Sequence, residues 1–393
     1  MNIIIISTGI LPQPAVKGGA VETLVDILIN YNEENLNNTI QTYSIYDEEA
    51  IKYSEKYDKC NFIYIKINKL IRYLFNKGIM PIRFMSKFFI NKVSKHIKDL
   101  NDFDLIVLQN QFNYLYKIEK VSNNKPLILH LHNDYINKYN KKFEKKIKPI
   151  DSIITVSDFL KTRIMEASDS ISVTTVHNGI SIDKFKKTSE VERSKLRKKY
   201  SINENDIVVI FAGRLSEEKG IKELLLAFNE LPINMSIKLL IIGSSFFNDS
   251  RESKFIKELK TIANVNKDKI IFTGFIPYDE IGKYYSIADI GCVPSTCNEA
   301  FGLTVIEQMS IGLPMIVSNM GALPEIVSEG SSIIVEYDEN YIHNIRNALE
   351  ILYNDGNLRT RMANNAIRRS RLFSHNIYAK KYFEAINKLI KKE

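Results

Sequence analysis

Hydrophobic positions along the chain fall into short β-branched runs separated by longer amphipathic stretches. Such runs are typical of buried strands in a parallel sheet, and the amphipathic stretches are typical of the helices that connect them. In the first half the pattern predicts strands at Asn2–Ser7, Asn61–Ile67, Leu105–Gln109, Leu127–His132, Ser152–Val156 and Val173–His177. Helices are predicted to begin near Val21 and near Asp158. The pattern therefore indicates the α/β class.

The second half starts the same arrangement again. It predicts strands at Ile207–Ala212, Lys238–Ile242, Ile270–Thr273, Ile290–Pro294, Met315–Ser318 and Ser332–Val335. The charged stretch Lys184–Lys199 separates the two sets of strands, so we expect a linker near residues 180–200 and domains at residues 1–185 and 200–374. The last stretch, His375–Glu393, has apolar residues at helical spacing, and the pattern alone would let it pack on either domain.

Composition agrees with two soluble globular domains. A chain of 393 residues is too long for one ordinary core and fits two lobes of roughly 150 to 200 residues with a cleft between them. Its three cysteines show no disulfide spacing, which indicates a reducing compartment, and we expect the cytoplasm. The apolar start lacks a basic n-region and predicts a buried strand rather than a signal peptide. No stretch approaches the roughly 18 uncharged apolar residues that span a membrane.

The net charge of +8 is unevenly distributed. From Lys59 to Lys98 there is no acidic residue, and within residues 66–98 lysines and arginines alternate with aromatic side chains. This segment has two interpretations: a peripheral contact with an anionic membrane surface, or a solvated basic face over core aromatics. Nucleic-acid binding is disfavoured, because no recognised binding module accompanies the cations.

Two glutamates bracket a glycine directly after the strand that ends at Pro294. Ligands of parallel α/β sheets bind where strands end, and a helix that follows offers free N–H groups to an anion. Glu299 would face a sugar, Gly302 would let a diphosphate approach the backbone, and Glu307 would accept hydrogen bonds from ribose hydroxyls. The segment predicted to bind the diphosphate and the groups attached to it comprises Phe301, Gly302, Leu303 and Thr304. The alternative is a pair of solvated glutamates on a helix face.

A second phosphate element follows the strand Ile207–Ala212. Here Gly213, Arg214, Lys219 and Gly220 form a turn that leads into a predicted helix at Ile221–Glu230. The charge on a diphosphate grows as it leaves, so a guanidinium and an ammonium are suitable partners for it. The alternative is a solvated turn.

The first half offers weaker signals. Gly18 and Gly19 precede a helix and could bring backbone amides to a phosphate or sugar, although they form neither a P-loop nor a dinucleotide fingerprint. His132 lies at a strand end, where it could donate to a sugar hydroxyl or a phosphate; a structural histidine is the alternative. His130 points to the same side one pleat deeper, and we expect it to be buried and hydrogen-bonded.

Metal sites are disfavoured throughout. Asp102 and Asp104 resemble a metal-binding Asp-x-Asp, yet they open a strand rather than close one. Cys292 and Cys297 lack partners at zinc spacing, and no Gly-x-Ser-x-Gly elbow is present.

The motifs in their order along the chain resemble those of the family 4 retaining glycosyltransferases. In the second half these are Gly213-Arg214, Lys219-Gly220, Pro294-Ser295, Glu299-x7-Glu307, Gly312-x-Pro314 and Gly321-Ala-Leu-Pro-Glu325. In the first half they are Gly18-Gly19, His132, Ser157 and Asn178-Gly179. The resemblance covers nearly the whole chain, and the joint order is far more specific than any single motif.

The resemblance implies a GT-B fold, with two Rossmann-like lobes that face a central cleft. It implies acceptor binding by the N-terminal lobe, nucleotide-sugar binding by the C-terminal lobe, and a C-terminal helix at 375–393 that crosses back to the first lobe. The catalytic group would comprise His132, Glu299, Arg214 and Lys219, without a metal or other cofactor. Retention of anomeric configuration also follows from the resemblance. The stretch Ser295–Asn298 varies widely in the family and leaves the donor sugar open.

We therefore expect an enzyme that transfers a hexosyl or N-acetylhexosaminyl group from a UDP-sugar to a lipid-linked or surface-polysaccharide acceptor. It would be cytoplasmic, at the inner face of the plasma membrane if residues 66–98 contact lipid. The rival interpretations are a non-catalytic subunit that stabilises an active partner, and an epimerase or phosphorylase on the same scaffold. The presence of Arg214, Lys219, Glu299 and Glu307 favours activity.

Overall fold

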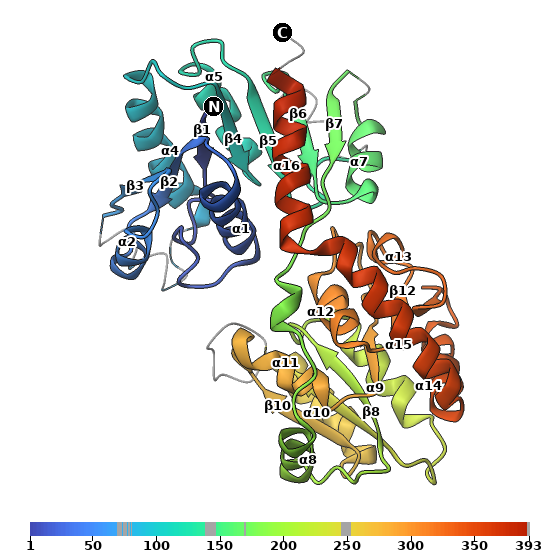
Figure 1. Ribbon diagram of the computed structural model, residues 1–393. Coiled ribbons are helices and arrows are strands. Elements are labelled where there is room, and N and C mark those ends of the chain that lie inside the picture. The colour runs from blue at the N-terminus through green and yellow to red at the C-terminus, as the bar shows by residue number, and fades with distance from the viewer. Residues whose placement is uncertain are drawn as a thin grey trace. The chain divides into compact units, whose positions relative to one another are not determined.

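The chain forms two compact units. The computed structural model describes residues 1–68, 73, 77, 79, 81–137, 147–168, 170–244 and 253–390. Unit 1 comprises Met1–Gly179 and His375–Glu393, and unit 2 comprises Ile180–Ser374 (Figure 1). The stretch interpreted as a linker is instead part of unit 2. There α8 (Glu190–Lys199) is anchored by the buried Arg197, whose guanidinium donates to the carbonyl oxygen of Ile287 at 2.9 Å.

Unit 1 is built on a seven-stranded parallel sheet with the order β3-β2-β1-β4-β5-β6-β7. Its strands are β1 (Asn2–Ile6), β2 (Thr39–Ile45), β3 (Cys60–Ile65), β4 (Leu105–Gln109), β5 (Leu127–Leu131), β6 (Ser152–Thr155) and β7 (Ser172–Thr175). The strand order reverses direction between β1 and β4. Crevices at such a switch point, outside the carboxyl ends of the strands, are where open α/β sheets bind ligands.

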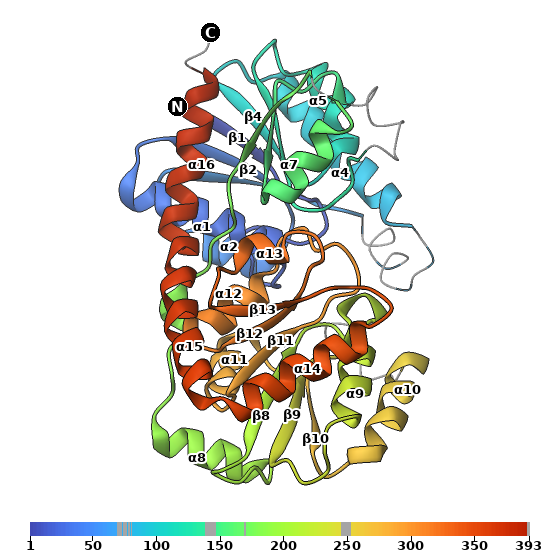
Figure 2. The ribbon, with the colours of Figure 1, turned by 90° about the vertical axis from the view of Figure 1, so that its right-hand side faces the viewer.

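Helices cover both faces of this sheet (Figure 2). They are α1 (Ala20–Asn35), α2 (Glu48–Ser54), α4 (Ile82–Lys98), α5 (Leu115–Glu119), α7 (Asp158–Met165) and α16 (His375–Ile390), with the 3₁₀ turn η1 (Phe112–Tyr114). Alternation along β1 explains the two layers: Ile4 and Ile6 pack with residues of α4 and α5, whereas Ile3 and Ile5 pack with residues of α1 and α16. The last helix of the chain therefore completes the core of unit 1.

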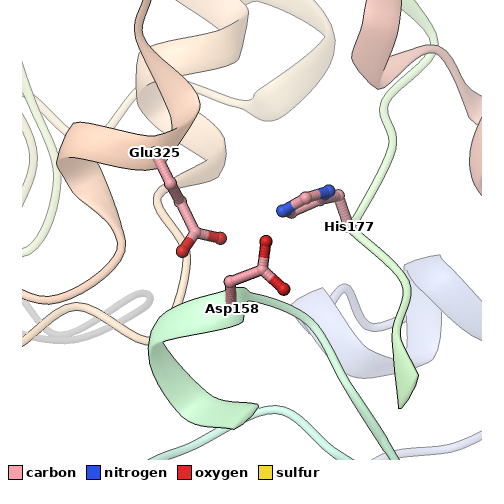
Figure 3. Close-up of side chains that lie close together, drawn as sticks. All are labelled: Asp158, His177 and Glu325. Carbon is pink, nitrogen blue, oxygen red and sulfur yellow. The ribbon is translucent and has the colours of Figure 1, made fainter. Parts of the chain in front are cut away.

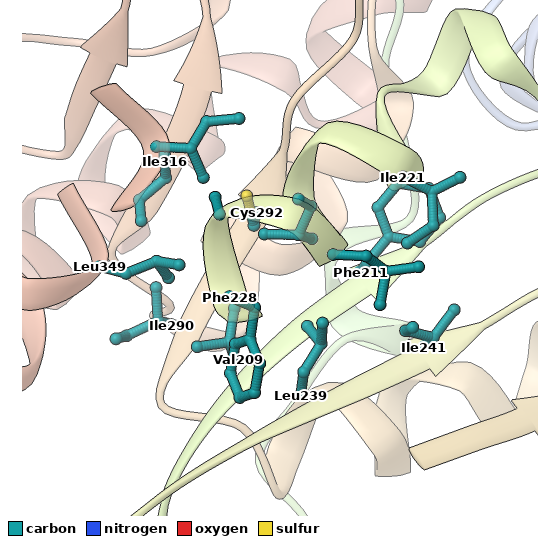
Figure 4. Packing of buried hydrophobic residues seen from close by; sticks show 14 of the residues in the cluster. Val209, Phe211, Ile221, Phe228, Leu239, Ile241, Ile290, Cys292, Ile316 and Leu349 are labelled. Atoms are coloured by element: carbon teal, nitrogen blue, oxygen red, sulfur yellow. The ribbon is translucent and has the colours of Figure 1, made fainter. Parts of the chain in front are cut away.

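Unit 2 has a six-stranded parallel sheet with the order β10-β9-β8-β11-β12-β13. Its strands are β8 (Ile207–Ala212), β9 (Ile237–Ile242), β10 (Ile270–Gly274), β11 (Ile290–Val293), β12 (Met315–Ser318) and β13 (Ser332–Val335). Figure 4 shows part of the core on one face, where Phe211, Ile241 and Cys292 of three strands meet Phe228 and Leu349 of two helices.

The helices of unit 2 fill the connections between these strands. They are α8, α9 (Ile221–Asn229), α10 (Lys254–Ala263), α11 (Tyr278–Ser286), α12 (Leu303–Ile311), α13 (Leu323–Ile326), α14 (Tyr341–Asn354) and α15 (Gly356–Ser370), with 3₁₀ turns η2 (Ile182–Lys184), η3 (Glu217–Lys219), η4 (Asn264–Asn266) and η5 (Arg371–Phe373). Helix α9 packs against α10 and α14, and α12 packs against α15.

The predicted α/β class is confirmed, and each predicted strand overlaps an observed one. Strand β2 was not predicted, because Thr39–Ile45 mixes polar and apolar residues. The basic segment 66–98 lies partly outside the described residues; its described part includes α4. Among the helices that the structure describes, none is long and apolar enough to cross a membrane.

Candidate active site

A lysine and a glutamate meet where the strands of the second sheet end. Lys219 is the last residue of η3, between β8 and α9, and Glu299 lies between β11 and α12. Lys219 Nζ lies 2.6 Å from Glu299 Oε1, and these side chains are 24% and 16% exposed. The buried Ser295 donates its hydroxyl to the same carboxylate oxygen at 2.7 Å. An anionic ligand could therefore compete with Glu299 for an ammonium that is already in place.

Arg214 lies in the same turn but forms a different pair. Its Nη2 lies 2.6 Å from Glu218 Oε1, and the arginine side chain is 54% exposed. Gly213, which precedes it, donates its backbone N–H to Ile242 of the neighbouring strand at 3.0 Å. The backbone before Arg214 is thus fixed to the sheet, whereas its guanidinium is open to solvent. A diphosphate oxygen could replace Glu218 there.

Two further hydrogen bonds, both from Thr296, join the turn after β8 to the segment after β11. The backbone N–H of Thr296 donates to Glu218 O at 3.0 Å, and its hydroxyl donates to Glu217 O at 3.1 Å. Gly220 adopts a left-handed conformation against this segment, and a Cβ there would lie 1.6 Å from Pro294 O. Only glycine fits this approach, so the two phosphate elements predicted separately form one structural block.

Helix α12 begins beside this block. Gly302 precedes its first residue with a φ of 129°, and no side chain caps the helix N-terminus. Leu303 and Thr304 form the first turn and are partly exposed, whereas Phe301 is buried and packs edge-on against Phe373 with ring centroids 6.0 Å apart. The first turn of α12 therefore offers backbone N–H groups and the positive end of the helix dipole to an anion.

Glu307 lies on the same helix but is buried, with 4% of its surface exposed. Tyr285 of α11 donates its hydroxyl to Glu307 Oε2 at 2.9 Å. Burial raises the pKa of Glu307 to about 7, and the hydroxyls of Tyr285 and Tyr278 oppose that rise. The carboxyl is thus buried and hydrogen-bonded by two tyrosine hydroxyls. Its contact with ribose hydroxyls stays a prediction.

His132 follows β5 at the carboxyl edge of the first sheet. Its backbone N–H donates to Asn110 Oδ1 at 3.0 Å, and its Nε2 lies 3.1 Å from Gln109 Oε1. Because that oxygen can only accept, Nε2 carries the proton and Nδ1 is left as an acceptor. Burial lowers the pKa of His132 to about 3, so the ring is neutral at physiological pH. Of the two predicted partners, a sugar hydroxyl therefore suits this ring better than a phosphate.

The expectation for His130 was half right. The residue is fully buried, but neither ring nitrogen has a hydrogen-bond partner among the described residues, so the predicted hydrogen bond is wrong. Ring packing holds it instead: its centroid lies 4.1 Å from that of His132 and 5.1 Å from that of Tyr382 on α16. Burial, with a smaller effect of His132, lowers its pKa well below the usual value.

Gly18 and Gly19 end the segment Thr8–Gly19 between β1 and α1, which is called the glycine loop below. Both have positive φ values, 74° and 102°. A Cβ on Gly19 would lie 2.3 Å from the carboxylate of Glu22, in the first turn of α1. The φ of 102° at Gly19 favours glycine, and the Glu22 carboxylate occupies the space beside it.

Asp104, one of the two aspartates considered as metal ligands, has a structural partner. Asp104 accepts the backbone N–H of Asn2 at 2.7 Å and so joins the starts of β4 and β1. Asp158 begins α7 and accepts the hydroxyl of Thr175 at 2.6 Å, while His177 lies in the segment that follows β7 (Figure 3). Cys292 is buried in the core of unit 2, which raises the pKa of its thiol. The expectation of a metal-independent site stays a prediction.

Comparison with known proteins supplies the deciding observation. Residues 192–369 match the family model "Glycosyl transferases group 1", and residues 56–184 match "Glycosyltransferase Family 4". The chain belongs to the group 1 glycosyltransferases. This glycosyltransferase is 29% identical to the Bacillus subtilis protein YtcC over 379 residues, which is 93% of this chain and 86% of that protein. It is also 29% identical to the lipopolysaccharide 1,2-N-acetylglucosaminetransferase of Salmonella typhimurium over 285 residues, 71% of each chain.

Solved structures share the fold of this glycosyltransferase. Anabaena Alr3699/HepE in complex with UDP matches with a TM-score of 0.76 at 21% identity, over 99% of this chain and 100% of that one. A glycosyltransferase from Rickettsia africae matches with a TM-score of 0.77 at 19% identity, over 100% and 99%. The glycosyltransferase therefore has the two-domain α/β GT-B fold that the resemblance implied.

The structure adds site residues that the motifs did not identify as functional. Ser295 stood within a quoted motif but was given no role, and the structure ties it to Glu299. Tyr285, Gln109 and Asn110 carried no signal, because each acts on a residue of another element and no fixed spacing marks such a contact.

Proposed function

We propose that this glycosyltransferase moves a sugar from a UDP-sugar to a lipid-linked or surface-polysaccharide acceptor, with retention of anomeric configuration. The observation that carries the proposal is the group of Lys219, Glu299 and Ser295 beside the uncapped N-terminus of α12. It combines a cation, a helix dipole and a carboxylate, which are the groups needed to hold a diphosphate next to a sugar. Crystal structures of Anabaena HepE contain UDP and UDP-glucose, which supports UDP as the nucleotide.

The chemistry follows from these groups. When the bond between the anomeric carbon and the diphosphate breaks, negative charge gathers on the leaving oxygen. Lys219 and Arg214 would stabilise that charge together with the N–H groups of α12. Glu299 would then accept hydrogen bonds from hydroxyls of the donor sugar once Lys219 turns to the diphosphate.

Retention requires the acceptor oxygen to arrive on the face from which the diphosphate leaves. We propose a front-face substitution in which a bond forms between the anomeric carbon and the acceptor oxygen, and the departing diphosphate takes the acceptor proton. No carboxylate of the motif set stands out as a covalent nucleophile, and Ser295, which donates to Glu299 Oε1, holds that carboxylate in one orientation. The role of this carboxylate is therefore orientation of the sugar.

A surface acceptor is supported by one relative and by the basic segment 66–98. The Salmonella relative is named as a lipopolysaccharide N-acetylglucosaminetransferase, which is a transferase for a cell-surface glycan. In the described part of the segment, α4 buries Phe89 and Val93 and exposes the cations Arg83, Lys87, Lys92, Lys95 and Lys98. Such a face would gain about 1 kcal/mol per cation near an anionic lipid surface.

The test is release of UDP that depends on an acceptor. Thermal shifts with UDP-, GDP- and ADP-sugars would first select the nucleotide, and a UDP-sugar is expected to give the largest shift. Turnover would then be followed with lipid-linked and oligosaccharide acceptors, and the anomeric configuration of the product would be read by NMR. UDP release without an acceptor, or an inverted product, would contradict the proposed transfer. Flotation with anionic vesicles at low salt tests the membrane contact, and a protein that stays in solution would exclude it.

A further inference from the structure

The glycine loop is held by side chains of the helix that follows it. Asp26 of α1 accepts the backbone N–H of Ala15 with its Oδ2 at 2.9 Å, and its Oδ1 accepts from Nε2 of Gln13. The same Gln13 nitrogen donates to the backbone oxygen of Glu22 at 3.0 Å, and the Gln13 N–H donates to Ser44 Oγ at 2.7 Å. Side chains therefore fix the middle of the loop, next to a turn in which the Gly18 N–H donates to Ala15 O at 3.0 Å.

Glu22 is bonded to one end of the loop and lies close to the other. Its Oε1 accepts the hydroxyl of Thr8 at 2.6 Å, where the chain leaves β1. Its other carboxylate oxygen lies against Gly19, so close that a Cβ on that glycine would lie only 2.3 Å away. Glu22 and Asp26 are four residues apart and therefore lie on one face of α1, and both side chains contact the glycine loop.

These carboxylates are in an unfavourable environment. Burial raises the pKa of Glu22, and it raises that of Asp26 to about 6, with Gln13 and Ala15 opposing the change. Burial of an ionised carboxylate costs free energy unless hydrogen bonds compensate it. A helix that only needed to pack on the sheet would carry apolar residues at these two positions. The fold retains acids there, and each acid is bonded to the loop.

We propose that Glu22 and Asp26 are positioning residues that hold the glycine loop, including Gly18 and Gly19, in one shape before a donor binds. The inference rests on the proposed function, because it assigns the backbone of the two glycines to an anionic or sugar group of the nucleotide-sugar. A loop that is already ordered loses little entropy on binding. The two acids therefore act on donor affinity rather than on the chemical step.

The variant Asp26→Asn tests this directly. It replaces one carboxylate oxygen by an NH₂ group, so either the Ala15 N–H or the Gln13 amide loses its acceptor. We expect the KM for the nucleotide-sugar to rise about tenfold while kcat stays within about twofold, as for the loss of one charged hydrogen bond. Glu34→Gln is the matched control, since Glu34 is an exposed acid on the same helix. A fall in kcat at unchanged KM would overturn the proposal.

Amide exchange of the full chain without donor gives a second measurement that does not depend on activity. Exchange of the Ala15 N–H is expected to quicken in Asp26→Asn and to stay at the wild-type rate in Glu34→Gln. Thr8→Val, which keeps both acids and removes only the hydroxyl bound by Glu22, should raise the KM less but in the same direction. Unchanged Ala15 exchange in Asp26→Asn would overturn the proposal. Faster exchange in a protein that uses no nucleotide-sugar would support the positioning role and refute the proposed function instead.

Discussion

The two sheets of this glycosyltransferase end in chemically different edges. In unit 2 the edge carries the partly exposed pair of Lys219 and Glu299. In unit 1 it carries His132, which is buried and neutral and is held by the amide side chains of Gln109 and Asn110. A partly solvated charge pair can exchange partners when an anion arrives, whereas buried neutral groups keep one geometry. The comparison separates an adaptable edge in unit 2 from a fixed edge in unit 1.

The largest effect is expected from removing the cation of the adaptable edge. Lys219→Ala should lower kcat/KM on the order of 100-fold, because one electrostatic partner of the growing diphosphate charge is lost. Lys222→Ala is the matched control: Lys222 pairs with Glu258 and its side chain is 40% exposed. Steady-state kinetics with the preferred UDP-sugar give the measurement. Wild-type kcat/KM in Lys219→Ala would remove the diphosphate assignment.

At the fixed edge, we expect turnover to fall when the tautomer of His132 is no longer fixed. In Gln109→Leu, Nε2 of His132 loses its acceptor, so the ring can protonate at either nitrogen and turnover should fall about tenfold. Long-range proton–nitrogen NMR of histidine-labelled protein would show Nε2–H in the wild type and a mixture in the variant. Gln111→Leu, two residues further on and partly exposed, is the control. If wild-type His132 proves to carry its proton on Nδ1, the assigned roles of Gln109 and His132 are reversed.

Glu307 shows what happens when a charge is buried within the adaptable edge. Its pKa is raised from 4.5 to about 7, so its protonated form favours the folded state, and this stability is lost as pH rises through 7. At about 1.4 kcal/mol per pKa unit, the lost stability is on the order of 3 kcal/mol. Glu307→Gln should therefore gain melting temperature relative to the wild type between pH 5 and pH 8.

Nucleotide binding gives the matching functional measurement for Glu307. If the carboxylate accepts ribose hydroxyls, calorimetric affinity for UDP in the wild type should fall as pH drops below about 7. Glu307→Gln should bind more weakly at pH 8, and any step in affinity due to this group should be absent. Equal affinity of both proteins at pH 8 would contradict a ribose contact.

The smallest effect is expected at the block that joins the two phosphate elements. Thr296→Val removes one hydrogen bond, from the hydroxyl to Glu217 O, and leaves the backbone bond to Glu218 O. The donor KM should rise about threefold. Thr261→Val on α10 removes a similar hydroxyl-to-carbonyl bond away from this block and should leave kinetics unchanged. A larger loss in Thr261→Val than in Thr296→Val would break the assignment.

Hydrophobic periodicity predicted most of the sheets because their strands are short apolar runs. Four strands, β4, β8, β12 and β13, have the predicted ends. Strand β2 was not predicted because Thr42 and Ser44 interrupt its apolar positions, although both are buried in the structure. Burial of small hydroxyls depends on neighbours elsewhere in the chain, which a local pattern does not contain.

The site was predictable only where a motif fixes the backbone. The strand ends and glycines placed Lys219 and Glu299 near ligands, but their direct pairing, across 80 positions, depends on packing of two loops. Glu22 carries no motif signal, because its contacts with Thr8 and Gly19 come from the path of the loop. The predicted hydrogen bond of His130 was wrong, because ring packing alone can hold a buried histidine.

Helix α16 makes the folding of unit 1 depend on the order in which the chain is synthesised. Its Tyr378, Tyr382, Phe383 and Ile386 belong to the core cluster that also contains Ile3 and Leu28. The ribosome makes the residues of α16 only after all of Ile180–Ser374. One face of the unit 1 sheet therefore stays uncovered by α16 until unit 2 has been synthesised. Unit 2 has no such delay, since its sequence is continuous. A nascent chain can therefore complete its later-made half first, and a premature stop codon late in the message would leave the earlier-made half with an uncovered apolar face.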